Sequence, residues 1–84
     1  MRILVNGRIY DGSTSEIALK LRDLLFDPIF VPDVEAYIQR MQRVYRSIME
    51  REMYLPIFDT EARARAMFEA LDAIGVFEIL EDET

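Results

Sequence analysis

The dipeptide Asn6-Gly7 separates two short apolar runs, residues 2–5 and 8–10. A two-residue type I′ turn needs positive φ at both central positions, and Asn-Gly is a pair that adopts this conformation readily. The sequence therefore predicts a β-hairpin built around this turn. Side chains of a strand point alternately to its two faces, so Ile3, Val5 and Ile9 alternate with Arg2, Leu4, Arg8 and Tyr10, and we expect one face to be more buried than the other.

A first helix is predicted directly after the hairpin. Ser13 and Glu16 have the spacing of a capping box, in which a serine caps the helix and a glutamate follows three residues later. Asp27-Pro28 should end the helix near residue 26, because proline disfavours helical geometry at the residue before it. The residues at helical spacing that should face the core are Ile17, Leu21, Leu24 and Leu25.

The second predicted helix, residues 34–52, carries the clearest periodicity in the chain. Asp33 is its expected N-cap, and a helix of this length would be roughly 28 Å long. A helix of this length is longer than a small sheet needs for its face to be covered, so we expect part of the apolar stripe of the helix to reach a second chain. The stripe consists of Val34, Tyr37, Ile38, Met41, Val44, Tyr45, Ile48 and Met49.

A third helix should begin at Asp59 or Thr60 and end at Gly75, which suits the left-handed position that follows a helix. Residues 76–80 then read as a third strand. The expected fold is α+β, in the order ββαααβ, with a three-stranded sheet whose helices pack on one face. We expect one small globular domain, residues 1–84, with residues 81–84 as a frayed acidic tail. The third strand could pair with either strand of the hairpin.

The chain contains no histidine and no cysteine. Imidazole bases, thiolate nucleophiles and histidine or thiolate metal sites are therefore excluded. A reaction or a magnesium site would need two carboxylates to converge, and the carboxylates near predicted helix starts are better explained as caps. We therefore expect no enzyme, no cofactor, no metal and no small-molecule substrate. These carboxylates belong to Asp11, Glu16, Asp59 and Glu61.

Residues 11–15, Asp-Gly-Ser-Thr-Ser, could form an anion-binding nest at the start of the first helix. They lack the lysine and the glycine-rich pattern of a phosphate-binding loop. A turn followed by a helix cap is therefore the preferred interpretation.

The net charge of −6 is confined to one end of the chain. Residues 1–65 carry equal numbers of acids and bases, whereas residues 66–84 carry six acids and no base. Such a segment is usually a solvated face, and a docking surface for a basic partner is the alternative. No stretch approaches the ~20 apolar residues that span a bilayer, so we expect no membrane contact. Because no cysteine indicates a redox compartment, a cytoplasmic location is the default expectation.

Arginines gather on the polar face of the second predicted helix. They form a basic strip that could bind nucleic-acid phosphates or an acidic partner. Alternatively, they pair with nearby acids on an ordinary solvated face. The sequence pI near 4.5 argues against nucleic acid, and the connection to the third helix is too long for a helix-turn-helix. The strip consists of Arg40, Arg43, Arg46 and Arg51.

Two strongly apolar loops, residues 29–31 and 54–58, flank the second predicted helix. Capping of the core is their expected role, and a protein-binding patch is the alternative. Hydrophobic residues make up 51% of the 84 residues, which is more than so small a domain easily buries.

These features favour a non-enzymatic protein–protein interaction or accessory domain, acting as a homodimer or with a protein partner. The candidate interface anchors are Tyr37, Met41, Tyr45, Tyr54 and Phe58. The alternative is a nucleic-acid-associated regulator that uses the basic strip.

Overall fold

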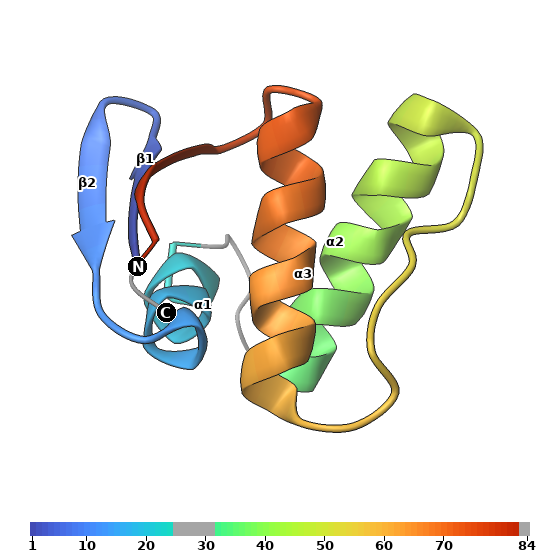
Figure 1. The fold of residues 1–84 in the computed structure, drawn as a ribbon, viewed down its shortest axis with the longest axis horizontal. Coiled ribbons are helices and arrows are strands. Elements are labelled where there is room, and N and C mark those ends of the chain that lie inside the picture. The colour runs from blue at the N-terminus through green and yellow to red at the C-terminus, as the bar shows by residue number, and fades with distance from the viewer. Residues whose placement is uncertain (25–31, 83–84) are drawn as a thin grey trace.

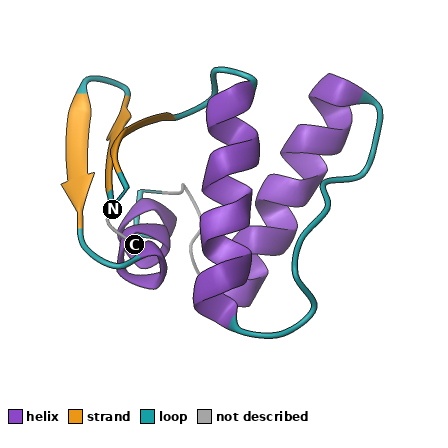
Figure 2. Ribbon diagram, viewed as in Figure 1, coloured by secondary structure: helices purple, strands orange, loops and turns teal. Residues whose placement is uncertain are grey.

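The computed structural model describes residues 1–24 and 32–82. Helices cover one face of a three-stranded sheet (Figures 1 and 2), which confirms the predicted α+β architecture and its ββαααβ order. The elements are β1 (Arg2–Val5), β2 (Arg8–Asp11), α1 (Thr14–Arg22), α2 (Val34–Met49), α3 (Thr60–Ala73) and β3 (Glu78–Glu81).

The predicted hairpin is confirmed. Val5 pairs with Arg8 across the turn, and the φ angles of Asn6 and Gly7 are 51° and 79°. Both angles are positive, as a type I′ turn requires. The third strand pairs antiparallel with β1, so the strand order is β2-β1-β3 and the first strand of the chain occupies the centre of the sheet.

The two faces of the hairpin differ from the prediction at one position. Ile3 pairs with Tyr10, and Leu4 pairs with Ile9. Ile3 is fully buried, whereas Ile9 is 61% exposed on the outer face. The predicted grouping of Ile9 with Ile3 on one face is therefore wrong, because this turn pairs odd-numbered residues with even-numbered ones. Tyr10 takes the inner position beside Ile3.

An ion-pair chain crosses the sheet at its outer face. The guanidinium of Arg2, in the central strand, lies 3.2 Å from a carboxylate oxygen of Asp11 and 3.3 Å from one of Glu81. The next residue, Asp82, forms an ion pair with Arg65 of α3. The predicted fraying of residues 81–84 is thus wrong at residues 81 and 82, since both take part in tertiary contacts. Residues 83 and 84 lie outside the described residues.

α1 begins as predicted and ends earlier than predicted. The Ser13 hydroxyl accepts a hydrogen bond of 3.1 Å from the backbone N–H of Glu16. The helix ends at Arg22, where the N–H of Leu24 bonds to the carbonyl of Leu21 and tightens the last turn. Leu24 is 58% exposed and was wrongly assigned to the core. Leu25 and the expected Asp27-Pro28 stop lie outside the described residues.

α2 begins at the predicted cap, where a carboxylate oxygen of Asp33 accepts a hydrogen bond of 2.8 Å from the N–H of Ala36. It ends at Met49 rather than near residue 52. Glu50 adopts a left-handed conformation with φ 56°, and its N–H bonds to the carbonyl of Arg46. A helical hydrogen-bond ladder cannot continue through this conformation, so α2 is roughly 24 Å long.

α3 is capped by Asp59 rather than by Thr60. The Asp59 carboxylate accepts a hydrogen bond of 3.1 Å from the N–H of Glu61. At the other end, Gly75 has φ 80°, and the N–H of Val76 bonds to the carbonyl of Leu71 at 2.9 Å. This is the Schellman pattern, which confirms the predicted role of Gly75.

α2 and α3 run in the same direction, so their connection must return along the length of α2 (Figure 1). The ion pair between Glu35 and Arg63 joins the N-terminal ends of the two helices. We name residues 53–58 of this connection the strap. An extended chain of this kind covers about 3.3 Å per residue, so residues 50–59 can span the helix.

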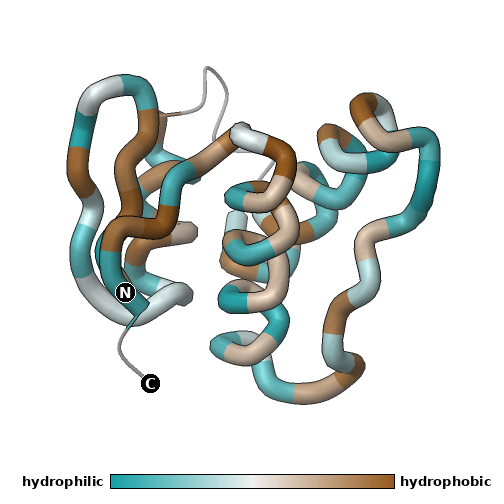
Figure 3. The backbone as a smooth tube through the Cα atoms, turned by 45° about the horizontal axis from the view of Figure 1, so that its top comes forward, coloured by the Kyte–Doolittle hydropathy of each residue, from teal (hydrophilic) through white to brown (hydrophobic). Residues whose placement is uncertain are grey.

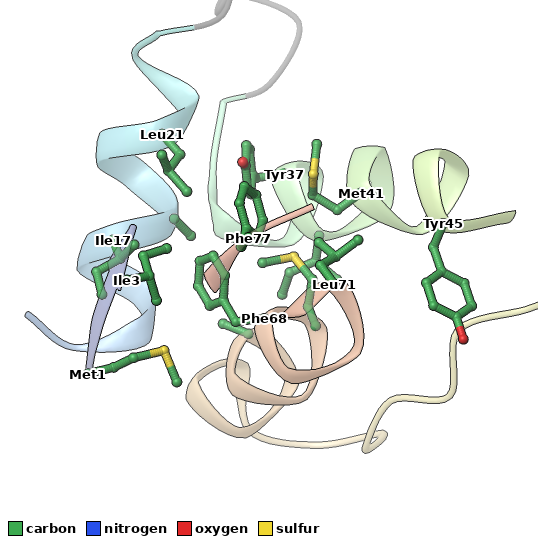
Figure 4. Close-up of a cluster of buried hydrophobic side chains, with 14 of the residues drawn as sticks. Met1, Ile3, Ile17, Leu21, Tyr37, Met41, Tyr45, Phe68, Leu71 and Phe77 are labelled. Carbon is green, nitrogen blue, oxygen red and sulfur yellow. The ribbon is translucent and has the colours of Figure 1, made fainter. Parts of the chain in front are cut away.

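The core lies between the sheet and helices α1 and α3, and it continues between these helices and α2 (Figure 4). Phe68 of α3 is its largest fully buried side chain, and its ring centroid lies 5.5 Å from that of Phe77, which leads into β3. The other buried apolar residues are Met1, Ile3, Ile17, Ala18, Leu21, Tyr37, Ile38, Met41, Tyr45, Met53, Ala64, Met67 and Leu71.

Candidate functional site

Three of the five predicted interface anchors lie in the core. Tyr37, Met41 and Tyr45 have 3%, 8% and 7% of their surface exposed. These three side chains therefore belong to the core of this chain, where α2 packs against α1 and α3, whereas Ile48 of the same apolar stripe is 53% exposed. Tyr45 lies apart from the other labelled residues of Figure 4, with its ring directed toward the segment that joins α2 to α3.

The other two anchors lie on the strap and are exposed. Tyr54 and Phe58 have 91% and 82% of their surface exposed, and Ile57 has 80%. The expectation that this loop caps the core is wrong for these three residues. Only Met53 is buried, and Leu55 packs at the edge of the core. The second apolar loop, residues 29–31, lies outside the described residues.

The strap is fixed to the body of the protein although the side chains of Tyr54, Ile57 and Phe58 are exposed. A guanidinium nitrogen of Arg63, Nη1, donates a hydrogen bond of 2.7 Å to the carbonyl oxygen of Pro56. The same guanidinium holds Glu35 of α2 through Nε at 3.0 Å. Figure 3 shows hydrophobic residues along this part of the chain, outside the layer of helices. The result is an ordered apolar surface.

The predicted basic strip divides into two halves. Arg46 forms an ion pair of 2.5 Å with Glu52. Arg51 donates a hydrogen bond of 3.2 Å to the Tyr45 hydroxyl, and its guanidinium carbon lies 5.9 Å from the centre of the Tyr45 ring. These two arginines therefore stabilise the C-terminal end of α2 and the start of its connection to α3.

Arg40 and Arg43 form the other half, and both are exposed. Within the described ranges 1–24 and 32–82, neither guanidinium takes part in an ion pair. The two residues line a shallow groove of about 340 Å³ on α2, together with Val44, Ser47 and Ile48. We name this the α2 groove. It combines two positive charges with an apolar floor, and Ile48 is 53% exposed.

The spacing of the α2 arginines does not favour the middle of the helix. Arg40, Arg43 and Arg46 follow one another at intervals of three residues, and α2 carries no acid from Ala36 to Met49. Like charges at neighbouring positions on a helix surface destabilise it by roughly 0.2–0.5 kcal/mol per pair. The arrangement is therefore not explained by the stability of α2.

The segment considered as an anion nest, residues 11–15, binds a carboxylate of the protein itself. Oε1 of Glu61, in the first turn of α3, accepts a hydrogen bond of 3.1 Å from the backbone N–H of Ser15. The Thr14 hydroxyl also donates to the Glu61 carboxylate. Glu61 therefore caps α1 from another helix, a role that no local pattern in the sequence indicated.

Partial burial raises the pKa of Glu61, but hydrogen bonds from Ser15, Thr14 and Ser13 outweigh it and lower the pKa to about 2. Tyr37 shows the opposite direction. Burial raises its pKa to about 12, although the charge of Arg40 lowers it in part and Tyr10 adds to the increase. Near neutral pH the Glu61 carboxylate is therefore ionised and the Tyr37 hydroxyl is protonated.

Other carboxylates are also engaged in structural contacts. Asp59 caps α3, and an oxygen of Asp72 accepts a hydrogen bond of 3.1 Å from the N–H of Ile79. Asp72 borders a second hollow of about 440 Å³ between the hairpin turn and the end of α3. Within the described part of the chain, no group of three metal-ligating side chains is close enough to hold a metal ion.

Comparison with protein-family models, with curated proteins and with solved structures found no match to this chain. Among the described residues, no helix has both the length and the apolar character needed to cross a membrane. The strap and the α2 groove are two surface features of this chain that suit the binding of a partner.

Proposed function

We propose that this chain is a non-catalytic protein-interaction domain that self-associates through its strap. The observation that carries the proposal is the exposure of Tyr54, Ile57 and Phe58, at 80–91%, on a segment that is itself held in place. Aromatic residues are enriched at the energetically important positions of protein interfaces.

The anchoring of the strap supports this role. Met53 is buried on one side of the exposed residues, and the carbonyl of Pro56 is held by Arg63. Proline also fixes its own φ angle. A surface that is ordered before binding loses less conformational entropy when it binds, which strengthens the association.

A second copy of the chain is the partner that we propose. Residues 53–58 carry no charge, so two straps can meet without opposing like charges although each copy has a net charge of −6. A two-fold dimer places the same patch of each copy against itself. Burial of three large apolar side chains from each copy then provides the driving force.

Sedimentation equilibrium over a range of protein concentrations tests the proposal. We expect the wild type to form a dimer, and we expect Phe58→Asp to weaken the dimer by about tenfold or more, since loss of a central anchor typically removes about 2 kcal/mol or more and about 1.4 kcal/mol corresponds to tenfold. Ile9→Asp is the matched control, because Ile9 is 61% exposed on the outer face of the sheet. It should dimerise like the wild type.

Two results would overturn the proposal. One is a wild-type chain that stays monomeric at every concentration tested. The other is a dimer that Phe58→Asp and Tyr54→Asp leave unchanged while Ile9→Asp disrupts it. The second result would place the contact on the sheet.

A further inference from the structure

We infer that the α2 groove is a second binding site, and that its ligand is an acidic peptide segment of another protein that also carries an apolar side chain. This inference is independent of self-association through the strap. It combines the charge of Arg40 and Arg43 with the apolar floor that Val44 and Ile48 provide.

The charge of the groove is the first argument. All five residues that line it are either basic, apolar or hydroxyl-bearing, and none is acidic. Arg46 and Arg51 have partners in Glu52 and Tyr45, whereas Arg40 and Arg43 are directed to solvent without an ion pair in the described ranges. An arginine guanidinium forms strong, charge-assisted hydrogen bonds with carboxylates.

The apolar floor is the second argument. Ile48 is 53% exposed at the groove, and Val44 reaches from the groove to the core, against which it is partly packed. A side chain such as leucine from a partner would remove this surface from water. Ser47 adds a hydroxyl that can donate or accept a hydrogen bond. The groove therefore suits a ligand with alternating acidic and apolar residues.

A nucleic acid fits these observations less well. Affinity for a phosphate backbone comes from many simultaneous contacts with lysine and arginine, and only two arginines of the strip remain available. The chain as a whole carries a net charge of −6, so it repels a long polyanion. The two positive charges of Arg40 and Arg43 do not offset this repulsion along the whole length of such a ligand. A short acidic segment can instead place its carboxylates close to Arg40 and Arg43.

Fluorescence anisotropy with a labelled peptide tests the inference. The probe is a short peptide in which single leucines separate pairs of glutamates. A matched peptide has glutamine in place of every glutamate. We expect the acidic peptide to bind at least tenfold more tightly than the glutamine peptide, and added salt to weaken that binding.

The variants locate the binding site. The double variant Arg40→Gln, Arg43→Gln and the variant Ile48→Ser should each reduce affinity for the acidic peptide by about tenfold or more. Arg46→Gln is the matched control and should bind like the wild type, because Arg46 is already paired with Glu52. All these positions are exposed, and circular dichroism checks that each variant folds. Phe58→Asp should also bind normally, which separates this site from the strap.

Four results would overturn the inference. Two concern the peptides: the acidic peptide does not bind, or it binds no more tightly than the glutamine peptide. Alternatively, the Arg40 and Arg43 double variant binds like the wild type. Finally, a single-stranded oligonucleotide of the same length that binds more tightly, and that loses affinity in the double variant, would assign the groove to nucleic acid.

Discussion

Glu61 of α3 caps α1: its carboxylate accepts a hydrogen bond of 3.1 Å from the N–H of Ser15, which lies 46 residues earlier in the chain. The contact joins the first turns of two helices. It also gives a hydrogen-bond partner to a backbone N–H in the first turn of α1, which has no partner within that helix. A negative charge at this position is further favoured by the dipole of α1.

Glu61→Gln should lower the free energy of unfolding by about 1 kcal/mol near neutral pH, the usual effect of losing a helix cap. The folded pKa, about 2, lies below the ordinary value of 4.5. The stabilisation by the carboxylate is therefore complete above about pH 4.5 and is lost as the pH falls toward 2. Urea unfolding of both proteins at several pH values measures this difference, which should shrink in acid.

Glu69→Gln provides the control for this prediction, because Glu69 is exposed on the same helix. It should leave stability nearly unchanged. A gap between wild type and Glu61→Gln that stays constant down to pH 2 would contradict the proposed role of the charge.

Ionisation of the buried Tyr37 hydroxyl should make the folded protein less stable in strong base. Burial raises the pKa of its hydroxyl from 10.0 to about 12, so the folded state retains a proton that the unfolded chain loses. Stability is then complete below about pH 10 and falls as the pH rises toward 12. Tyr37→Phe should remove this part of the pH dependence in urea unfolding. Tyr54→Phe, at a position that is 91% exposed, should retain it.

Glu50→Gly should stabilise the protein by about 1 kcal/mol, because glycine adopts the left-handed conformation without the steric strain of a side chain. Glu50 has φ 56° at the end of α2. Thermal unfolding measures the change. Ser47→Gly, within the regular part of α2, should instead destabilise by about 1 kcal/mol. A loss of stability in both variants would show that the conformation of Glu50 carries no strain.

Phe77→Ala should destabilise the fold by about 3–5 kcal/mol, the usual range for removing a buried aromatic ring. Phe77 is 8% exposed and packs on Phe68. Leu80→Ala is the control in the same segment, since Leu80 is 42% exposed, and it should have a much smaller effect. Similar losses in the two variants, measured by urea unfolding, would contradict this description of the core.

The features predicted well from sequence are those that a few neighbouring residues determine. Asn6-Gly7 defines the hairpin turn, Ser13 and Asp33 cap their helices, and Gly75 ends α3. Each depends on backbone geometry or hydrogen bonds within one turn of the chain. Such local requirements can be read from the sequence without knowledge of the fold.

The candidate site could be predicted only in part. Periodicity identified the apolar stripe of α2, but it could not distinguish packing against the chain's own helices from packing against a second copy. The strap was expected to cap the core, because the parallel arrangement of α2 and α3 was not foreseen. The role of Glu61 depends on a contact between distant segments, and the division of the basic strip depends on where α2 ends.

The position of β1 at the centre of the sheet has a consequence during synthesis. The hairpin and helices α1, α2 and α3 leave the ribosome before β3 does, so one edge of β1 has no partner throughout that interval. Contacts so distant along the chain form slowly, and an unpaired strand edge is a template for pairing with other chains. Coverage of this edge of β1 in the nascent protein therefore depends on β3, the last of the three described strands to be synthesised.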